Sequence, residues 1–273
     1  MKKACVIGWP IKHSRSPLIH GHWLDKYGIE GSYEKRAVEP KDLPEFLQNL
    51  EANGFSGCNV TVPHKEAAFR LADVVHAEAK AVEAANTLWL EDGKLHAANT
   101  DIYGFMTHLD QSAPSWNAKD RPVVLLGAGG AARAILYGLL NGGAREVRLI
   151  NRTRERAEEL AAYYDSGVTI IDWQNRDDGL VDCGLVVNST TLGMTGSPDL
   201  DLSLDVLPED AVVADIVYAP LETPLLATAR EKGCRTVDGL GMLLHQAVPG
   251  FQRWFGVRPE VTDELRDLVV ADL

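Results

Sequence analysis

The sequence predicts an α/β fold, because short apolar runs alternate along the chain with segments of helical spacing. One stretch carries most of this prediction. The apolar residues 123–126 precede a glycine-rich turn, a helical stretch that reaches about Leu140, and a second apolar run at 147–150. This order of strand, glycine turn, helix and strand is typical of a Rossmann-type nucleotide-binding domain.

The elements before this domain alternate in the same way. Residues 5–8 form an apolar run, residues 17–27 begin with a proline and have helical spacing, and residues 32–38 alternate as a strand does. Helical spacing then returns over residues 43–50. Residues 112–122 are rich in turn-forming residues and are predicted to link a first domain, residues 1–111, to a nucleotide domain, residues 112–239.

The next predicted strand ends in a polar motif. Val60 and Val62 alternate there with Asn59 and Thr61, and Pro63, His64 and Lys65 follow. Pro63 has no N–H to donate and should end the ladder, and Lys65 should open a helix. A lysine at the end of a strand can act as an acid, a base or a charge clamp, because its pKa moves readily on burial. The simpler alternative is a solvated lysine.

A β-hairpin is predicted next, with Asp92-Gly93 as its tight turn. Asn86-Thr87 leads its first strand, and Asn99-Thr100-Asp101 follows its second strand and precedes a helical segment at 103–111. Asp101 alone could be a helix N-cap. Together with Lys65, however, these groups could surround one small polar ligand.

The glycine-rich turn fits the pattern G-x-G-x-x-A through Gly127, Gly129 and Ala132. Glycines permit the tight turn and the close approach of a pyrophosphate to the helix N-terminus. Because the required strand, helix and second strand surround the turn, we predict dinucleotide binding. The predicted contacts are Gly127, Ala128, Gly129, Gly130 and Ala131.

The second strand of this unit ends in Asn151-Arg152-Thr153, where an NAD site usually has an acidic residue. A guanidinium at Arg152 suits the 2′-phosphate of NADP, and Arg156 could flank the same phosphate. Thr153 could cap the following helix. The alternative, strongest for Arg154, is a solvated arginine on the helix surface.

The remaining elements continue the alternation. Strands are predicted at residues 185–188, 212–215 and 236–237, and Thr223-Pro224 should start a helix. A last helical pattern begins at Leu240, in which Pro249 should cause a kink.

Composition limits the possible functions. A net charge of −12 with no basic stripe argues against nucleic-acid binding. The four cysteines are widely spaced, which fits reduced thiols in the cytoplasm, and no segment suggests a signal peptide, a membrane span or a metal site. The expected oligomeric state is a monomer or a homodimer.

The motifs together resemble the shikimate dehydrogenase family along the whole chain. The matching stretches are Gly8 to Pro17, Asn59 to Lys65, Asn86-Thr87, Asn99 to Asp101, Gly127 to Ala131, Asn151 to Thr153, Asp215 to Tyr218, and Asp238 to Leu243 with Gln246. The resemblance implies that residues 240–273 complete the first, substrate-binding domain.

The family's site residues can be carried over position by position. The resemblance implies that Ser14 and Ser16 bind the substrate carboxylate and that Lys65 and Asp101 form the catalytic pair. Ser16 could alternatively serve only as a helix cap. Further substrate contacts are implied for Thr61, Asn86, Tyr218 and Gln246, and nicotinamide contacts for Ile216, where the family often has Met, and Gly239.

The resemblance therefore implies NADP-dependent shikimate dehydrogenase activity, the reversible reduction of 3-dehydroshikimate to shikimate in the route to chorismate and the aromatic amino acids. One alternative is a quinate/shikimate dehydrogenase that uses NAD or NADP, which an acidic residue in place of Arg152 would favour. The other is a non-catalytic NADP-binding sensor, which would lack Lys65 or Asp101.

Overall fold

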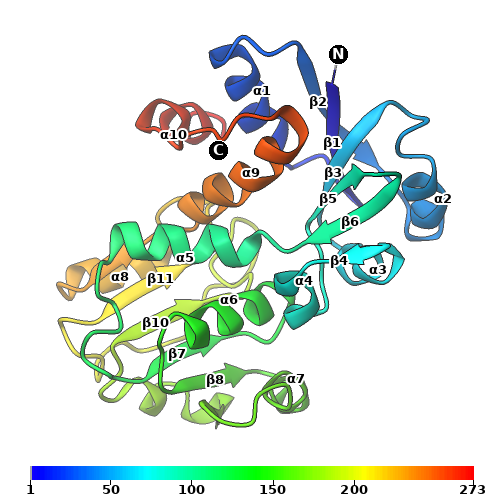
Figure 1. Cartoon of the computed structure of the whole chain (residues 1–273). Helices are drawn as coiled ribbons and strands as arrows, with labels where there is room; N and C mark the ends of the chain where they lie inside the picture. The colour runs from blue at the N-terminus through cyan, green and yellow to red at the C-terminus, as the bar shows by residue number, and fades with distance from the viewer. Residues whose placement is uncertain (1) are drawn as a thin grey trace. The chain divides into compact units, whose positions relative to one another are not determined.

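The computed structural model describes residues 2–273, which divide into two compact units. The first unit comprises residues 2–103 and 244–272, and the second comprises residues 104–243. Each unit is built on its own six-stranded sheet (Figure 1). The α/β class predicted from the sequence is therefore confirmed.

The sheet of the first unit is mixed, with strand order β2-β1-β3-β5-β6-β4. Its strands are β1 (Lys2–Gly8), β2 (Gly31–Ala37), β3 (Phe55–Val60), β4 (Val74–Val75), β5 (Thr87–Glu91) and β6 (Lys94–Ala98). Its helices are α1 (Ser16–Lys26), α2 (Leu43–Gln48), α3 (Lys65–Leu71), α4 (Ala77–Val82) and α10 (Asp263–Val270). Two longer helices, α5 (Asp101–Ser112) and α9 (Gly239–Phe255), each have residues in both units.

The register of three strands gathers polar motifs at one edge of this sheet. β5 is antiparallel to both β3 and β6, with Thr87 opposite Asn59 on one side and opposite Ala98 on the other. The carboxyl ends of β3 and β6 therefore lie beside the amino end of β5. Asp92 and Gly93 form the predicted hairpin turn, both with positive φ.

Helix α9 packs against the same sheet through Trp254. Its indole Nε1 donates a hydrogen bond of 2.9 Å to the carbonyl oxygen of Leu88. A Cβ atom at Gly57 would lie 2.2 Å from that nitrogen, so only glycine leaves room for the indole at this point of β3. Pro249 lies inside α9, which is helical on both sides of it.

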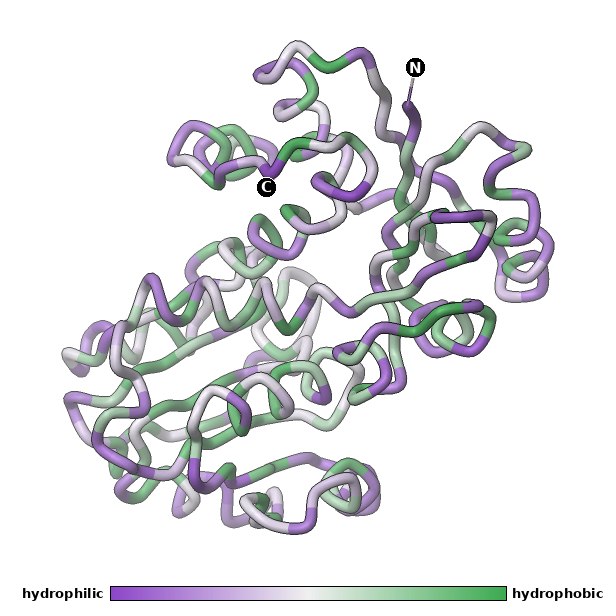
Figure 2. The backbone as a smooth tube through the Cα atoms, viewed as in Figure 1, coloured by the Kyte–Doolittle hydropathy of each residue, from purple (hydrophilic) through white to green (hydrophobic). Residues whose placement is uncertain are grey.

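The second unit has an all-parallel sheet with strand order β12-β11-β10-β7-β8-β9. Figure 2 shows hydrophobic residues along these strands and hydrophilic residues on the surrounding loops, as a sheet covered by helices requires. The strands are β7 (Val123–Leu126), β8 (Val147–Asn151), β9 (Val168–Asp172), β10 (Leu185–Asn188), β11 (Val212–Asp215) and β12 (Arg235–Val237), with helices α6 (Gly130–Asn141), α7 (Arg154–Ala161) and α8 (Pro224–Glu231).

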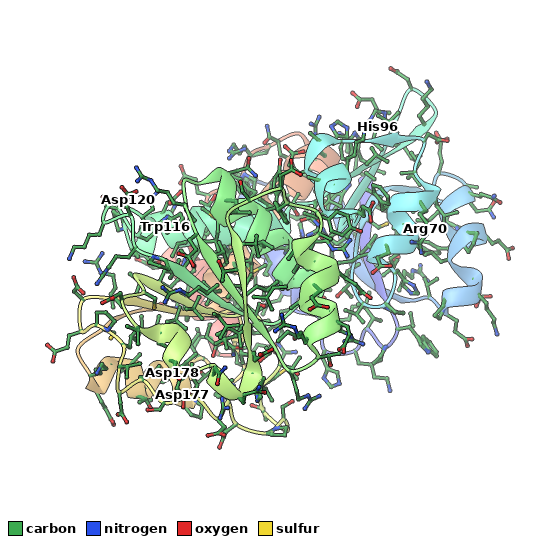
Figure 3. All side chains as sticks on the ribbon, turned by 90° about the horizontal axis from the view of Figure 1, so that it is seen from below. Arg70, His96, Trp116, Asp120, Asp177 and Asp178 are labelled. Atoms are coloured by element: carbon green, nitrogen blue, oxygen red, sulfur yellow. The ribbon has the colours of Figure 1, made fainter. Side chains whose placement is uncertain are left out.

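The turn-rich segment 112–122 belongs to the second unit. Trp116, labelled in Figure 3, is buried in that unit's core. Its indole donates a hydrogen bond to Asp110 at 2.9 Å. Among residues 2–273, no helix is both long enough and apolar enough to cross a membrane.

Several local expectations need correction. β3 ends at Val60, two residues earlier than the alternation suggested, because the chain turns directly after it, with His64 N–H donating to Thr61 O at 3.0 Å. Ser16 is the first residue of α1 and not its cap, and Arg15 holds the cap position. Thr153 does hold the cap position of α7, but its side chain makes no capping hydrogen bond.

Candidate functional site

Lys65 is positioned by the turn between β3 and α3. The neighbouring His64 is buried, and its Nε2 lies 2.8 Å from the carbonyl oxygen of Val38. The carbonyl oxygen of Lys65 accepts from Ala85 N at 2.9 Å. These contacts fix the backbone at His64 and Lys65, and the Lys65 side chain is only partly exposed.

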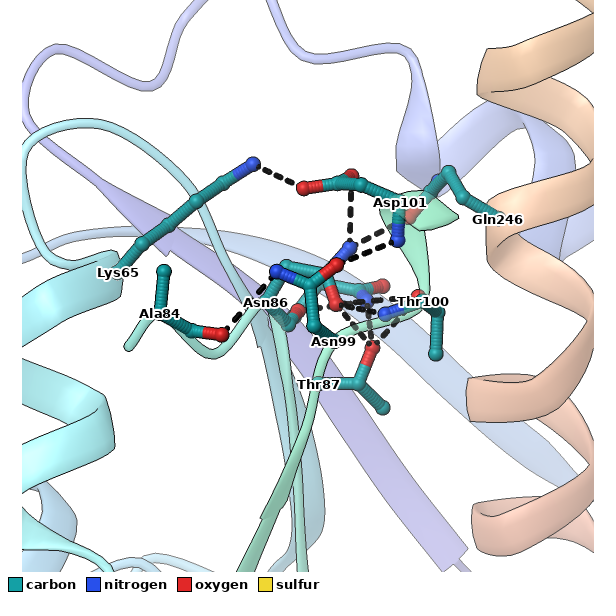
Figure 4. Close-up of polar contacts among 9 residues, drawn as sticks. Lys65, Ala84, Asn86, Thr87, Asn99, Thr100, Asp101 and Gln246 are labelled. Carbon is teal, nitrogen blue, oxygen red and sulfur yellow. Dashed lines mark hydrogen bonds and ion pairs between the residues drawn. The ribbon is translucent and has the colours of Figure 1, made fainter. Parts of the chain in front are cut away.

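The ammonium group of Lys65 pairs with the carboxylate of Asp101, with Nζ 2.6 Å from Oδ2 (Figure 4). Asp101 is the first residue of α5 and is 7% exposed. Its backbone N–H donates to Asn99 Oδ1 at 3.0 Å. Asn99 therefore accepts the hydrogen bond at the start of this helix, and the Asp101 side chain points to Lys65. A shielded pair of this kind is stronger than an ion pair at the surface.

Asn86 holds the other oxygen of this carboxylate. Its Nδ2 donates to Asp101 Oδ1 at 2.9 Å and lies 3.4 Å from Gln246 Oε1. Its Oδ1 accepts from the backbone N–H of Thr100 at 2.7 Å. Because an N–H can only donate, this contact fixes which end of the amide faces Asp101. Both oxygens of Asp101 are therefore engaged.

Ser14 and Ser16 lie at the start of α1 in the same unit, and their hydroxyl oxygens are 3.3 Å apart. Ser14 Oγ also accepts from Ser16 N at 3.3 Å. Two hydroxyl groups beside a helix N-terminus present donors to an anion. Thr61 follows β3, and Gly8 lies so close that a Cβ there would be 2.6 Å from Thr61 Cγ2.

The glycine turn of the second unit fits a bound pyrophosphate. Gly127 has φ of +109°, and a Cβ there would lie 2.6 Å from Ser189 Oγ. Gly129 and Gly130 are exposed at the start of α6, and a Cβ at either would meet nothing within 4 Å. The helix N-terminus therefore has open space in front of it, with Ala128 and Ala131 on either side of these two glycines.

The three arginines after β8 differ in their contacts. Arg154 is paired with Glu158 and Asp172. Arg152 and Arg156 are exposed, and no hydrogen bond or ion pair within residues 2–273 engages either guanidinium. Asn151 closes the turn by donating from Nδ2 to Thr153 O at 2.7 Å. Arg152 and Arg156 are therefore available to a phosphate, whereas Arg154 is not.

The segment after β11 carries the other residues predicted in this unit. A Cβ at Gly239 would lie 2.2 Å from Ile216 O, so the two backbones touch and require glycine there. Tyr218 is partly buried on the same segment. Asp215, just before it, is buried, and desolvation raises the pKa of its carboxyl group despite hydrogen bonds from Val217, Thr223 and Asn188.

Sequence reasoning did not predict the buried hydrogen-bond partners of this site. Asn59, Thr87 and Thr100 each make side-chain hydrogen bonds within it, and they could have been noticed because they stand inside the same motifs. Tyr33 joins them from β2, where no motif marks it. No cluster of three potential metal ligands occurs among residues 2–273.

Three family models match the chain. They are described as shikimate dehydrogenase substrate binding domain (residues 6–88), shikimate/quinate 5-dehydrogenase (residues 109–194) and shikimate 5′-dehydrogenase C-terminal domain (residues 239–264). Together they cover well over half of the sequence.

Whole-chain relatives agree with these matches. The chain is 56% identical to a shikimate dehydrogenase (NADP(+)) of Mesorhizobium japonicum, over 100% of this chain and 97% of the relative. Shikimate 5-dehydrogenase of Thermus thermophilus, solved with NADP(H) and shikimate, is 33% identical with a TM-score of 0.89 over 100% of both chains. Quinate dehydrogenase of Corynebacterium glutamicum, solved with NAD, is 31% identical with a TM-score of 0.92 over 99% of both.

Proposed function

This chain belongs to the shikimate dehydrogenase family, and from this premise we propose how its residues catalyse NADP-dependent, reversible reduction of 3-dehydroshikimate to shikimate. The observation that carries the proposal is the shielded pair of Lys65 and Asp101, held 2.6 Å apart. When NADPH is bound, it supplies the hydride. The protein supplies orientation and a proton.

Lys65 and Asp101 have complementary roles in this proposal. As the C3 ketone is reduced, negative charge develops on its oxygen, and the Lys65 ammonium group stabilises that charge and supplies the proton. Asp101 orients the ammonium group and accepts a hydrogen bond from the neighbouring substrate hydroxyl. In the reverse direction, the same pair removes the proton from the C3 hydroxyl.

Substrate and cofactor contacts follow from the same residues. We assign the substrate carboxylate to Ser14 and Ser16, and the ring hydroxyls to Thr61, Asn86, Tyr218 and Gln246. Residues 127–131 would hold the pyrophosphate, and Ile216 and Gly239 the nicotinamide. Arg152 and Arg156 would hold the 2′-phosphate of NADP, since neither guanidinium has a hydrogen-bond or ion-pair partner within residues 2–273.

A steady-state assay tests this function directly. Purified protein with shikimate and NADP should reduce the cofactor, and its kcat/KM for shikimate should exceed that for quinate. A protein with the reverse preference is a quinate dehydrogenase. Binding of NADP without turnover of either acid would identify the non-catalytic sensor.

Loss of either serine hydroxyl is expected to weaken substrate binding. Ser14→Ala and Ser16→Ala each remove a neutral donor from an anion, which costs about 1.5–3 kcal/mol, and KM for shikimate should rise by about 10- to 150-fold. KM for NADP should stay near the parent value. An equal rise for both would instead indicate a disturbed start of α1.

Loss of the Arg152 guanidinium is expected to weaken NADP selectively. Arg152→Ala should lower kcat/KM for NADP by about 5- to 150-fold and leave NAD nearly unchanged, because NAD has no 2′-phosphate to contact. Arg154→Ala is the matched control, since Arg154 is already paired with Glu158 and Asp172. An equal loss with both cofactors would refute the assignment of Arg152 to the 2′-phosphate. If the unmodified protein already prefers NAD, the quinate-type enzyme is favoured.

The four cysteines are free thiols, in keeping with the reducing cytoplasm that we propose for this enzyme. We propose a monomer or a homodimer, which light scattering of the purified protein would distinguish.

A further inference from the structure

A line of buried polar side chains runs through the first unit behind Asp101. Tyr33 on β2 donates from its hydroxyl group to Asn59 Oδ1 at 2.6 Å. Asn59 Nδ2 donates to Thr87 Oγ1 at 3.2 Å, and Thr87 Oγ1 lies 3.1 Å from Asn86 Oδ1. Each of these side chains belongs to a residue that is less than a tenth exposed.

Backbone groups fix the direction of these hydrogen bonds. Asn59 Nδ2 also lies 3.1 Å from Asn86 O, a carbonyl that can only accept. The amide oxygen of Asn59 must therefore face Tyr33, which makes the phenol the donor. At the other end, Thr100 N–H fixes Asn86 in the same manner. Donors thus point from Tyr33 to Asn59 and from Asn59 to Thr87. The Thr87 hydroxyl reaches Asn86 Oδ1 directly at 3.1 Å or by way of the Thr100 hydroxyl, and Asn86 Nδ2 donates to Asp101.

Neighbouring groups also act on Tyr33. Burial raises the pKa of its phenol, and the Ser16 side chain opposes that shift. The His20 ring stacks on the phenol with centroids 3.9 Å apart, and burial lowers the pKa of His20 to about 3, so the imidazole is neutral. Lys65 faces Asp101 at one end of the line, and the Cys5 and Cys58 thiols act on Tyr33 at the other.

We propose that Tyr33 and Thr87 are positioning residues that, acting through Asn59 and Asn86, hold the Asp101 carboxylate toward Lys65. This inference rests on the proposed role of Asp101. A line of aligned donors that ends on an ionised acceptor strengthens each bond in turn, and the effect is larger in a buried site. A carboxylate with both oxygens so engaged has little freedom to rotate away from Lys65.

Two substitutions interrupt the line without touching Lys65 or Asp101. Tyr33→Phe removes the first donor, and Thr87→Val replaces a hydroxyl by a methyl group of similar size. We expect kcat to fall by about 5- to 30-fold for each, the loss from one buried hydrogen bond. The low-pH limb of the kcat profile should move to higher pH, because the carboxylate loses support for its charged form.

Two further variants separate positioning from general structure. Tyr27→Phe removes a phenol hydroxyl that accepts only from Glu260 N at 3.2 Å in the same unit, so kcat and the pH profile should stay at the parent values. Thr87→Ser keeps the hydroxyl group and should restore most of kcat. Because Tyr33 and Thr87 act in series, the double variant should lose less than the product of the single losses.

The kcat of the single variant Asp101→Asn, measured beside these variants, distinguishes the catalytic proposal from the positioning inference. If Asp101→Asn retains full kcat, the proposed catalytic role itself is wrong. If Asp101→Asn is inactive while folded Tyr33→Phe and Thr87→Val keep the parent kcat and pH profile, only the positioning inference is overturned. Variants that lose thermal stability alone, with an unchanged kcat below their melting temperature, would overturn the positioning inference as well.

Discussion

Replacement of Lys65 by alanine is expected to lower kcat by about 10²- to 10⁴-fold, with a much smaller change in KM for shikimate. The ammonium group faces Asp101 at 2.6 Å and belongs to a helix whose start is fixed by buried contacts of His64. Its removal takes away the proton donor and the charge that stabilises the developing alkoxide. Steady-state rates with saturating NADP and varied shikimate measure both parameters.

Lys80→Ala is the matched control for this variant. Lys80 is an exposed lysine on α4 of the same unit, so its loss changes the net charge equally without touching the pair. We expect parent kinetics for it. A Lys65→Ala enzyme that keeps more than about a third of the parent kcat would remove Lys65 from the chemistry.

Asp101→Asn is expected to lower kcat by a similar factor, about 10²- to 10⁴-fold. Asn86 should fix the orientation of the new amide at position 101. Its Nδ2 donates to Oδ1 there, so the amide oxygen is favoured on that side. The new NH₂ group would then face the Lys65 ammonium group, donor against donor. Lys65 would lose both its orientation and its counter-charge.

Circular dichroism and thermal melting decide how an Asp101→Asn defect is understood. The backbone start of α5 is served by Asn99 Oδ1, which the substitution leaves in place, so the secondary structure should match the parent. A folded but inactive protein supports the catalytic role. An unfolded protein would show that Asp101 serves mainly to start α5.

Much of the fold could be predicted because its signals are local. The hairpin around Asp92-Gly93, the strand 123–126 with its glycine turn, and the helix that Lys65 opens are all specified by residues within one element or its neighbour. The end of β3 at Val60 could not be predicted in this way. It depends on the turn between Thr61 and His64, which forms while Thr61 N–H still donates across the sheet to Ile7 O.

In the polar site, too, residues within local motifs could be predicted and residues brought in from other strands could not. Motifs named Lys65, Asn86 and Asp101, but nothing near Tyr33 in the sequence indicates that it hydrogen-bonds Asn59. That pairing arises from the order of strands, with β1 between β2 and β3. The role of Ser16 at the helix start was equally undecided until the structure placed Arg15 at the cap.

The packing of Trp254 against Gly57 and Leu88 has a consequence for the order of events during synthesis. Leu88 leaves the ribosome 166 residues before its indole partner, and the whole second unit is made in between. That face of the first unit's sheet is covered only once Trp254 has been made, by which point residues 104–243 of the second unit have already been synthesised. Domains generally fold as their sequence emerges, so the nucleotide-binding unit should form first, and catalytic competence arrives only with the last helices.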